Sequence, residues 1–266
     1  KGAVNCRAID GLKEGEEVLF MDSGNKKMSQ HSTLLTWLGL FDKIRKLFAA
    51  QAKLLNLNLS SSHFSHFSGS GRCPYCQGQG KIKTSLDFMA DVWSVCEECN
   101  GRKYTKKVLE CTLNGKNISE VLEMSVSEAA VFFAFDTYLS GAFSRLISLG
   151  LGYVKCGLPL NTFSGGEIQR IGLAKTILNS KGKSSVMLFD EPGRGLHFND
   201  VEMLMLLFRE LCLQGHSIIM VEHNPDMLKN ADYLIDLGPG AGEAGGRLLY
   251  QGVPEGVLTL KESPTA

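Results

Sequence analysis

The last third of this chain alternates short apolar runs with one helical segment, and this rhythm constrains the fold more than any other feature. Residues 186–189 are apolar and lead into acids, a helical pattern begins at Asn199 and ends at Gly215, and residues 216–224 contain a second apolar run. Two further strand-like runs cover residues 232–238 and 246–252. Strand, helix and strand in this order form a βαβ unit with parallel strands and helices on their faces. We therefore predict an α/β fold.

Four of the eight cysteines form two Cys-x2-Cys pairs, with nineteen residues between the pairs. Each pair forms a tight turn that offers two thiolates, and two such turns complete a tetrahedron around zinc without an open position. This spacing favours a structural Zn²⁺ site in a reducing compartment over a disulfide framework. The predicted ligands are Cys73, Cys76, Cys96 and Cys99.

The other thiols and two nearby histidines are given structural roles. We expect ordinary buried thiols at Cys6, Cys111, Cys156 and Cys212. His63 and His66 precede the first pair and could compete as ligands. Because four thiolates already fill a zinc shell, we expect both histidines to be surface or interface residues.

A serine, two glycines and a glutamate stand at the start of a helical segment: Ser164, Gly165, Gly166 and Glu167. The simplest interpretation of Ser-x-x-Glu is a capping box. The glycines favour a second interpretation, because a first turn without side chains bares backbone N–H groups at the positive end of the helix dipole. Such a helix start binds phosphate well.

Two acids and a histidine follow the apolar runs of the βαβ unit. Asp190 and Glu191 end the first run, and His223 comes just after the second. Paired acids at the end of a buried strand are placed to hold Mg²⁺ and to orient or deprotonate an attacking water. The alternative is an acidic strand end in a loop, with a histidine used for packing.

In this order and spacing, the motifs resemble the C-terminal half of an ABC-type ATPase domain. The resemblance implies that Ser164, Gly165, Gly166 and Glu167 form the signature, which contacts the γ-phosphate of ATP held by an opposite module. It also implies that Asp190 binds Mg²⁺, that Glu191 is the general base, and that His223 touches the γ-phosphate. Residues 195–200 would then lie at a dimer contact.

The phosphate loop of such an ATPase is missing from this sequence, because no GxxxxGK[ST] pattern occurs in the 266 residues. The "GKS" at 182–184 lacks the earlier glycine and lies between a helix and a strand. In the ABC family the loop precedes the signature, so the chain looks like a piece of a longer protein. We expect these residues alone not to hydrolyse ATP.

The cysteine pairs narrow the resemblance. A zinc module placed before the signature, followed by the acidic strand and the histidine, resembles the UvrA family, the damage-recognition ATPases of bacterial nucleotide excision repair. The likeness covers about residues 70–257 and implies the second, C-terminal ATPase module. It further implies lesion-bearing double-stranded DNA, a UvrB-like partner, and a homodimer or a module pair within one chain. The apolar runs are too short to span a membrane, and we expect a cytoplasmic protein.

The zinc module is the basic part of a chain with zero net charge. Residues 72–107 hold seven cations and four acids, which gives +3. The cations are Arg72, Lys81, Lys83, Arg102, Lys103, Lys106 and Lys107. They are placed to contact phosphates in a salt-sensitive, sequence-independent way, although a merely solvated basic face is the alternative. We expect Trp93 to pack around the metal.

These motifs predict five regions: a divergent remnant of the ATPase core and linker (1–62), the zinc module (63–110), a helical signature subdomain (111–180), the acid-and-switch half of the core (181–257) and a polar tail (258–266).

Three departures from the family pattern leave hydrolysis open. Residues 22–30 have no glutamine at the position where the family senses Mg²⁺ and the γ-phosphate, Gly193 and Arg194 replace two threonine-like residues, and Phe163 replaces leucine. The alternative function is a degenerate, non-hydrolysing module that acts as a zinc-bearing scaffold for DNA or a partner. A DnaJ-like chaperone module is disfavoured, because it would need four tandem cysteine repeats and no acidic strand.

Overall fold

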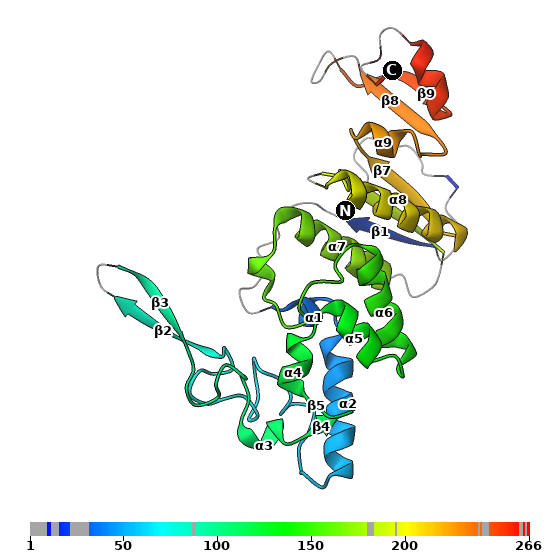
Figure 1. The fold of residues 1–266 in the computed structure, drawn as a ribbon. Coiled ribbons are helices and arrows are strands. Elements are labelled where there is room, and N and C mark those ends of the chain that lie inside the picture. The colour runs from blue at the N-terminus through cyan, green and yellow to red at the C-terminus, as the bar shows by residue number, and fades with distance from the viewer. Residues whose placement is uncertain are drawn as a thin grey trace. The chain divides into compact units, whose positions relative to one another are not determined.

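The computed structural model describes residues 10–11, 16–21, 32–86, 89–179, 184–194, 196–238, 240, 245–260, 263 and 265–266 (Figure 1). The chain divides into two compact units. The unit that we call the core unit comprises Lys1–Asn25, Ser148–Gly150 and Gly165–Ala266. The helical unit comprises Lys26–Ile147 and Leu151–Ser164. In the described parts of both units, no helix combines the length and apolar character needed to cross a membrane.

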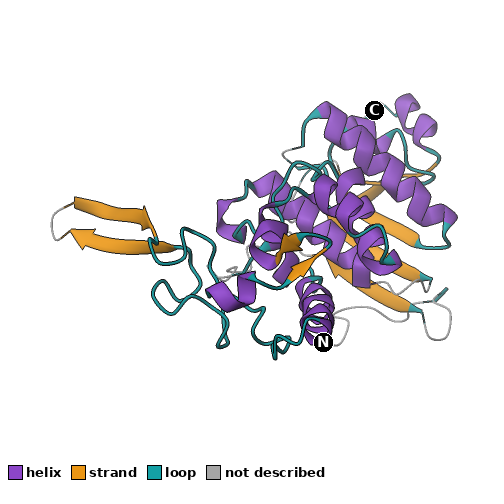
Figure 2. Ribbon diagram, turned by 60° about the horizontal axis from the view of Figure 1, so that its bottom comes forward, coloured by secondary structure: helices purple, strands orange, loops and turns teal. Residues whose placement is uncertain are grey.

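A parallel sheet forms the centre of the core unit. Strands β1 (Glu17–Met21), β6 (Ser185–Asp190) and β7 (Ser217–Val221) lie in the order β1-β6-β7. Parallel pairing aligns Leu188 with Phe20 on one side and Ile219 on the other. The predicted βαβ unit is therefore confirmed, and Figure 2 shows its strands beside the helices.

Helix α8 (Phe198–Leu213) covers one face of this sheet. Phe189 of β6 and Phe208 of α8 are nearly fully buried, and their rings stack with centroids 5.0 Å apart. The helix begins two residues earlier than predicted, because its N-cap residue is His197 and not Asn199. Gly215 adopts a left-handed backbone just beyond the helix, as its predicted role as a stop requires.

The last two strands do not extend the parallel sheet. Strands β8 (Leu234–Gly238) and β9 (Arg247–Gly252) pair with each other in antiparallel fashion, in a two-stranded sheet of their own. Helices α7 (Gly165–Asn179) and α9 (Pro225–Leu228) and the 3₁₀ segment Pro254–Thr259 complete the core unit. The predicted strands are thus present, but their pairing differs from that of β6 and β7.

The helical unit is built from short helices and two hairpins. Its helices are α1 (Leu34–Trp37), α2 (Phe41–Leu54), α3 (Lys106–Leu109), α4 (Ile118–Glu123), α5 (Val126–Phe132), most of α6 (Thr137–Ser148) and the 3₁₀ turn Leu160–Thr162. Its hairpins are β2 (Lys81–Leu86) with β3 (Met89–Val95), and β4 (Thr112–Leu113) with β5 (Lys116–Asn117).

Local sequence explains the helix starts and the buried face of this unit. A Ser-x-x-Glu capping box begins α5 at Ser125: its Oγ accepts from the Glu128 N–H, and the Glu128 carboxylate accepts from the Ser125 N–H. In α2 the side chains of Phe41, Ile44 and Phe48 recur at helical spacing, and all three are buried. These apolar positions therefore form the buried stripe of the helix.

We predict that Phe189→Ala lowers the free energy of unfolding of the core unit by about 3–5 kcal/mol, because it removes a buried ring from the contact between sheet and helix. Urea unfolding measures this change. The matched control is Leu206→Ala on the same helix, where the side chain is 57% exposed; it should change stability by less than about 0.5 kcal/mol. Equal losses in the two variants would contradict this account of the core.

Candidate functional site

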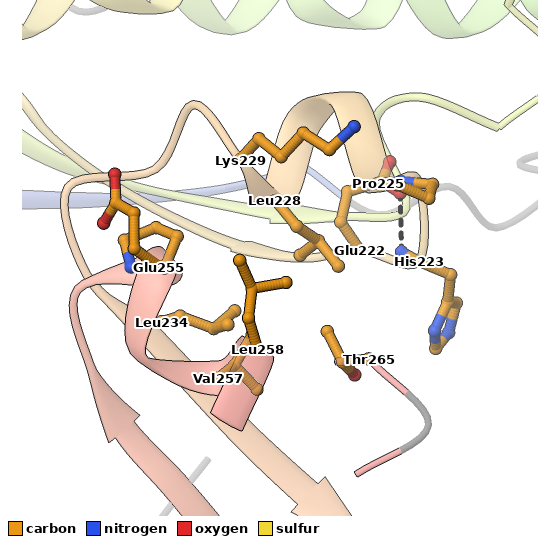
Figure 3. A pocket seen from close by; sticks show the side chains of 11 residues that line it. Glu222, His223, Pro225, Leu228, Lys229, Leu234, Glu255, Val257, Leu258 and Thr265 are labelled. Carbon is orange, nitrogen blue, oxygen red and sulfur yellow. Dashed lines mark hydrogen bonds between the residues drawn. The ribbon is translucent and has the colours of Figure 1, made fainter. Parts of the chain in front are cut away.

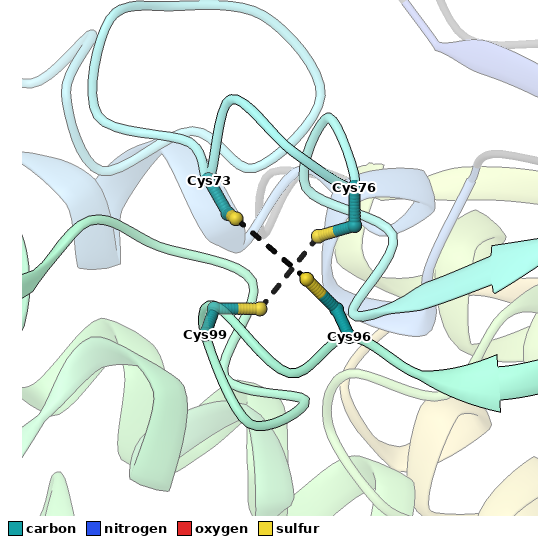
Figure 4. A group of neighbouring side chains, drawn as sticks. All are labelled: Cys73, Cys76, Cys96 and Cys99. Atoms are coloured by element: carbon teal, nitrogen blue, oxygen red, sulfur yellow. Dashed lines mark hydrogen bonds between the residues drawn. The ribbon is translucent and has the colours of Figure 1, made fainter.

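The four paired cysteines come together in one buried cluster of the helical unit (Figure 4). All their sulfur atoms lie within 4.8 Å of one another. Cys73 Sγ is 4.0 Å from Cys96 Sγ, and Cys76 Sγ is 3.6 Å from Cys99 Sγ. A tetrahedron with Zn–S bonds of about 2.3 Å has edges of about 3.8 Å, which these two separations match closely.

Left-handed residues shape the two cysteine turns. Gln77 and Gly78 in the first turn, and Asn100 and Gly101 in the second, have positive φ angles. At Gly78 a Cβ atom would lie 1.8 Å from the carbonyl oxygen of His66, so only glycine fits there.

Backbone hydrogen bonds then close the cluster. The Gly80 N–H donates to the Cys76 sulfur over 3.2 Å, and the Cys96 N–H donates to the Gly80 carbonyl over 3.0 Å. A hydrogen bond to a sulfur atom stabilises its thiolate form, which is the form that binds metal.

The thiol pKa values in the metal-free protein differ by environment. Burial raises the pKa of Cys99 to about 12 and also raises the pKa of Cys76. A backbone N–H of Cys99 that donates to Cys96 lowers the pKa of the Cys96 thiol. Because zinc binds thiolates, metal binding must release protons from this cluster.

The structure corrects the expectation for His66. Its side chain is buried, and its ring packs against Phe41, Phe67 and Tyr104. Burial, together with the charges of Lys103 and Arg45, lowers the pKa of His66 to about 3, so the ring is neutral at physiological pH. The apolar side chains that bury His66 come mostly from segments distant in the sequence. The residues around His66 therefore do not predict its burial.

The buried thiol expectation holds for two of the remaining cysteines. Cys111 and Cys156 are buried. Cys212 on α8 is exposed, so the prediction of a buried thiol is wrong at that position. Cys6 lies outside the described residues.

The β2–β3 hairpin extends away from the cysteine cluster (Figures 1 and 2). Its register places Lys81 beside Val95 and Lys83 beside Trp93, so these four side chains share one face of the ribbon. Trp93 is 53% exposed, which overturns its predicted packing around the metal. A two-stranded ribbon offers too few neighbouring side chains to bury a large aromatic ring on that face.

The seven predicted cations divide into two groups. Arg72 and Lys103 are half-buried, and the Arg72 guanidinium donates to the carbonyl oxygen of Phe67. The exposed cations are Lys81, Lys83, Arg102, Lys106 and Lys107. The last three of these line a cavity of about 590 Å³ beside Cys99. The exposed group is the one that a phosphate backbone can reach, and one of its members, Lys83, pairs with the Asp91 carboxylate at 2.6 Å.

The signature stands where the chain passes from one unit to the other. Ser164 ends the helical unit, and Gly165 begins both the core unit and helix α7. Ser164 and Gly165 are exposed, and Gly166 and Glu167 are half-buried. Five residues further along α7, the Arg170 guanidinium pairs with the Asp200 carboxylate of α8 at 3.0 Å, which ties the signature helix to the sheet layer.

The predicted site residues Asp190, Glu191 and His223 lie at one edge of the parallel sheet. Glu191 has a left-handed backbone, and its N–H donates to the Val221 carbonyl over 2.8 Å. Its carboxylate lies 3.8 Å from His223 Nε2 and 3.1 Å from the Arg194 guanidinium. Asp190 precedes it as the last residue of β6 and is half-buried. The arrangement presents carboxylates and an imidazole at the carboxyl end of the strands.

A third acid at this edge was missed by sequence reasoning. The Glu222 carboxylate accepts hydrogen bonds from three backbone N–H groups, those of Gly193, His223 and Asn224. Figure 3 shows this side chain folded back onto the backbone of His223. The available signal was an acid directly before the histidine at a strand end.

A cavity of about 470 Å³ borders His223 in the core unit (Figure 3). Leu228, Leu234, Val257 and Leu258 form much of its wall, and Lys229, Glu255 and Thr265 add polar groups. The predicted signature residues and Asp190 and Glu191 do not line it.

Some predicted features lie outside the described residues. These are the departure at residues 22–30, most of the "GKS" at 182–184, and Gly195 in the dimer-contact segment. In that segment His197 and Phe198 are exposed, and the Phe198 side chain is 63% exposed.

Comparison with known proteins agrees with this geometry. No family model matches the chain. It is 39% identical over 259 residues to UvrABC system protein A of Micrococcus luteus, which covers 97% of this chain and 26% of that protein. It is 40% identical over 252 residues to the Helicobacter pylori protein of the same name, with coverages of 95% and 27%. The crystal structure of UvrA2 from Deinococcus radiodurans matches with a TM-score of 0.82 and 38% identity, over 94% of this chain and 31% of that one.

The fold and the site together define an α/β module of the ABC-type ATPase class, with an inserted four-cysteine module. The chain spans about a quarter of the length of the curated relatives that it matches. Within that class, it belongs to the UvrA family.

We predict that the protein purified without chelator carries one zinc per chain, and that Cys96→Ser loses it because three thiolates no longer close the tetrahedron. Elemental analysis by mass spectrometry measures the metal. Cys212→Ser, at the exposed thiol, is the matched control and should keep a full equivalent. Full zinc retention by Cys96→Ser would refute the assignment.

Proposed function

We propose that the chain is the C-terminal ABC module of a damage-recognition ATPase in nucleotide excision repair. The observation that carries this proposal is the convergence of Glu191 and His223 at the carboxyl edge of a parallel sheet, in a chain that also holds the four-cysteine cluster. The expected regions at 1–62, 63–110, 111–180, 181–257 and 258–266 form part of the same proposal.

The proposed site binds ATP between two modules. Ser164, Gly165, Gly166 and Glu167 present the start of α7 to the γ-phosphate of a nucleotide held by the opposite module. Mg²⁺, when bound, neutralises phosphate charge, and Asp190 is the proposed residue that holds it.

The remaining proposed steps of ATP hydrolysis take place at the sheet edge that carries Glu191 and His223. Glu191 orients and deprotonates the attacking water. Its carboxylate lies close enough to His223 for both side chains to act at the same γ-phosphate. His223 Nε2 then contacts the γ-phosphate. The exposed Arg194 guanidinium, paired with Glu191 at 3.1 Å, holds that carboxylate in place until substrate arrives.

The proposed nucleic-acid partner is double-stranded DNA with lesions. Five exposed cations of the zinc module supply phosphate contacts, and Trp93 on the hairpin offers an exposed ring to an unstacked base. Zinc held by Cys73, Cys76, Cys96 and Cys99 would fix the base of the hairpin, and four thiolates would leave it no open position for chemistry. A UvrB-like partner and a second ATPase module complete the proposed assembly in the cytoplasm.

The alternative function is a non-hydrolysing scaffold with the same partners. Gly193 and Arg194 favour it, since they depart from the family pattern directly beside Glu191. ATP turnover by the full-length polypeptide that contains this sequence separates the two functions.

We predict that Glu191→Gln lowers ATP turnover of that full-length polypeptide several-fold, because an amide cannot take a proton from water. Steady-state phosphate release measures the rate. Glu202→Gln on the exposed side of α8 is the control and should leave the rate unchanged. A rate unaffected by Glu191→Gln would favour the scaffold.

We also predict that Lys81→Ala combined with Lys83→Ala weakens binding to lesion-bearing duplex DNA and reduces the salt slope by about 2, since each lost phosphate contact removes about 0.9. Fluorescence anisotropy across a salt series measures both quantities. Lys53→Ala, an exposed lysine at the end of α2 in the same unit, is the control. An unchanged slope would remove the hairpin from the DNA interface.

A further inference from the structure

We propose that Glu222 is a positioning residue that joins the acidic turn after β6 to the switch segment after β7, with Gly193 as its matched partner. The proposal rests on the proposed ATP hydrolysis at this edge of the sheet. Glu222 itself touches no reacting atom in this account, and it acts through Glu191 and His223.

The hydrogen bonds of Glu222 connect two separate segments. One carboxylate oxygen accepts from the Gly193 N–H, in the turn that carries Glu191. The other accepts from the N–H groups of His223 and Asn224, at 2.8 and 3.0 Å. A carboxylate is acceptor-only and has enough lone pairs for all three bonds. The side chain therefore fixes the turn relative to the histidine that faces it.

The bonds also orient the switch histidine from its own backbone. Because the His223 N–H is held by the Glu222 side chain, the backbone of His223 is restrained, and with it the direction of the Cα–Cβ bond that carries the ring (Figure 3). The Asn224 side chain caps α9 by accepting from the Asp226 N–H, so the segment is held on its far side as well. The backbone segment that places His223 Nε2 3.8 Å from the Glu191 carboxylate is thus held on both sides.

Gly193 provides the space that this connection needs. A Cβ atom at residue 193 would lie 2.7 Å from a Glu222 carboxylate oxygen and 2.5 Å from the sulfur of Met227. Met227 is fully buried, so it has little room to move, and the carboxylate is the group that would be displaced. A side chain at 193 therefore breaks the same connection as a change at Glu222.

The two residues can be tested without removing either segment. Glu222→Gln keeps the volume of the side chain and one acceptor oxygen, but its amide nitrogen cannot accept the remaining N–H groups. Gly193→Ala keeps Glu222 and displaces its carboxylate. Both changes act on one contact, so their effects should not add.

Two readouts apply to the full-length polypeptide. We expect Glu222→Gln and Gly193→Ala each to lower kcat for ATP about tenfold, with KM within about twofold, because a misplaced base affects the chemical step and not the binding of ATP. The double variant should be no slower than the slower single variant. Hydrogen exchange at the Gly193 and His223 amides should accelerate about tenfold in Glu222→Gln, as loss of a bond to a charged acceptor requires. Glu202→Gln is the control for both readouts.

The outcomes distinguish this proposal from the proposed function. If Glu191→Gln lowers turnover and Glu222→Gln leaves kcat unchanged, the positioning role is wrong while the ATPase stands. If amide exchange at Gly193 is unchanged in Glu222→Gln, the connection is wrong whatever the turnover. If Glu191→Gln has no effect, the ATPase proposal fails. Accelerated exchange in Glu222→Gln would then support the connection alone.

Discussion

Parallel pairing of β6 with β7 is the constraint on which the candidate nucleotide site depends. Because the two strands run in the same direction, both carboxyl ends lie at one edge, where Asp190 is aligned with Val221. The first residue beyond β6 then bonds back to the end of β7, and the next residues of each segment are brought face to face. A slip of one residue would turn Asp190 to the opposite face of the sheet. Burial of Phe189 against α8 opposes such a slip.

The cysteine cluster depends on a different kind of constraint. Residues 55–80 form turns and bends with no helix or extended strand, so regular hydrogen bonding contributes little to their order. Left-handed residues in each turn, and hydrogen bonds that join the turns, bring four thiols within reach of one ion. Metal binding supplies a cross-link that the small apolar content of this segment cannot replace. The buried ring of Tyr104, whose hydroxyl donates to the Phe64 carbonyl, anchors the cluster to the rest of its unit.

The structure gives a local physical reason for glycine at position 193, where the sequence departs from the family pattern. A residue with a Cβ atom would collide with Glu222 and Met227, so glycine at this position and the folded-back Glu222 carboxylate belong together. Arg194 is likewise engaged, since its guanidinium pairs with Glu191. These contacts order the turn around the acids.

The sequence by itself determined the elements whose signals are local. Apolar period identified β6 and β7, and the cysteine spacing identified the ligand cluster. Each of these depends on residues a few positions apart, which is the range over which sequence period and turn chemistry act.

Only the tertiary structure decided the features that depend on partners distant in the chain. The antiparallel pairing of β8 with β9, the burial of His66, the exposure of Trp93 and Cys212, and the hydrogen bond that Glu222 accepts from Gly193 were all of this kind. A side chain is buried or bonded according to what another segment places beside it. For Glu222 the partner is Gly193, 29 residues earlier in the chain. No pattern in either segment predicts this hydrogen bond.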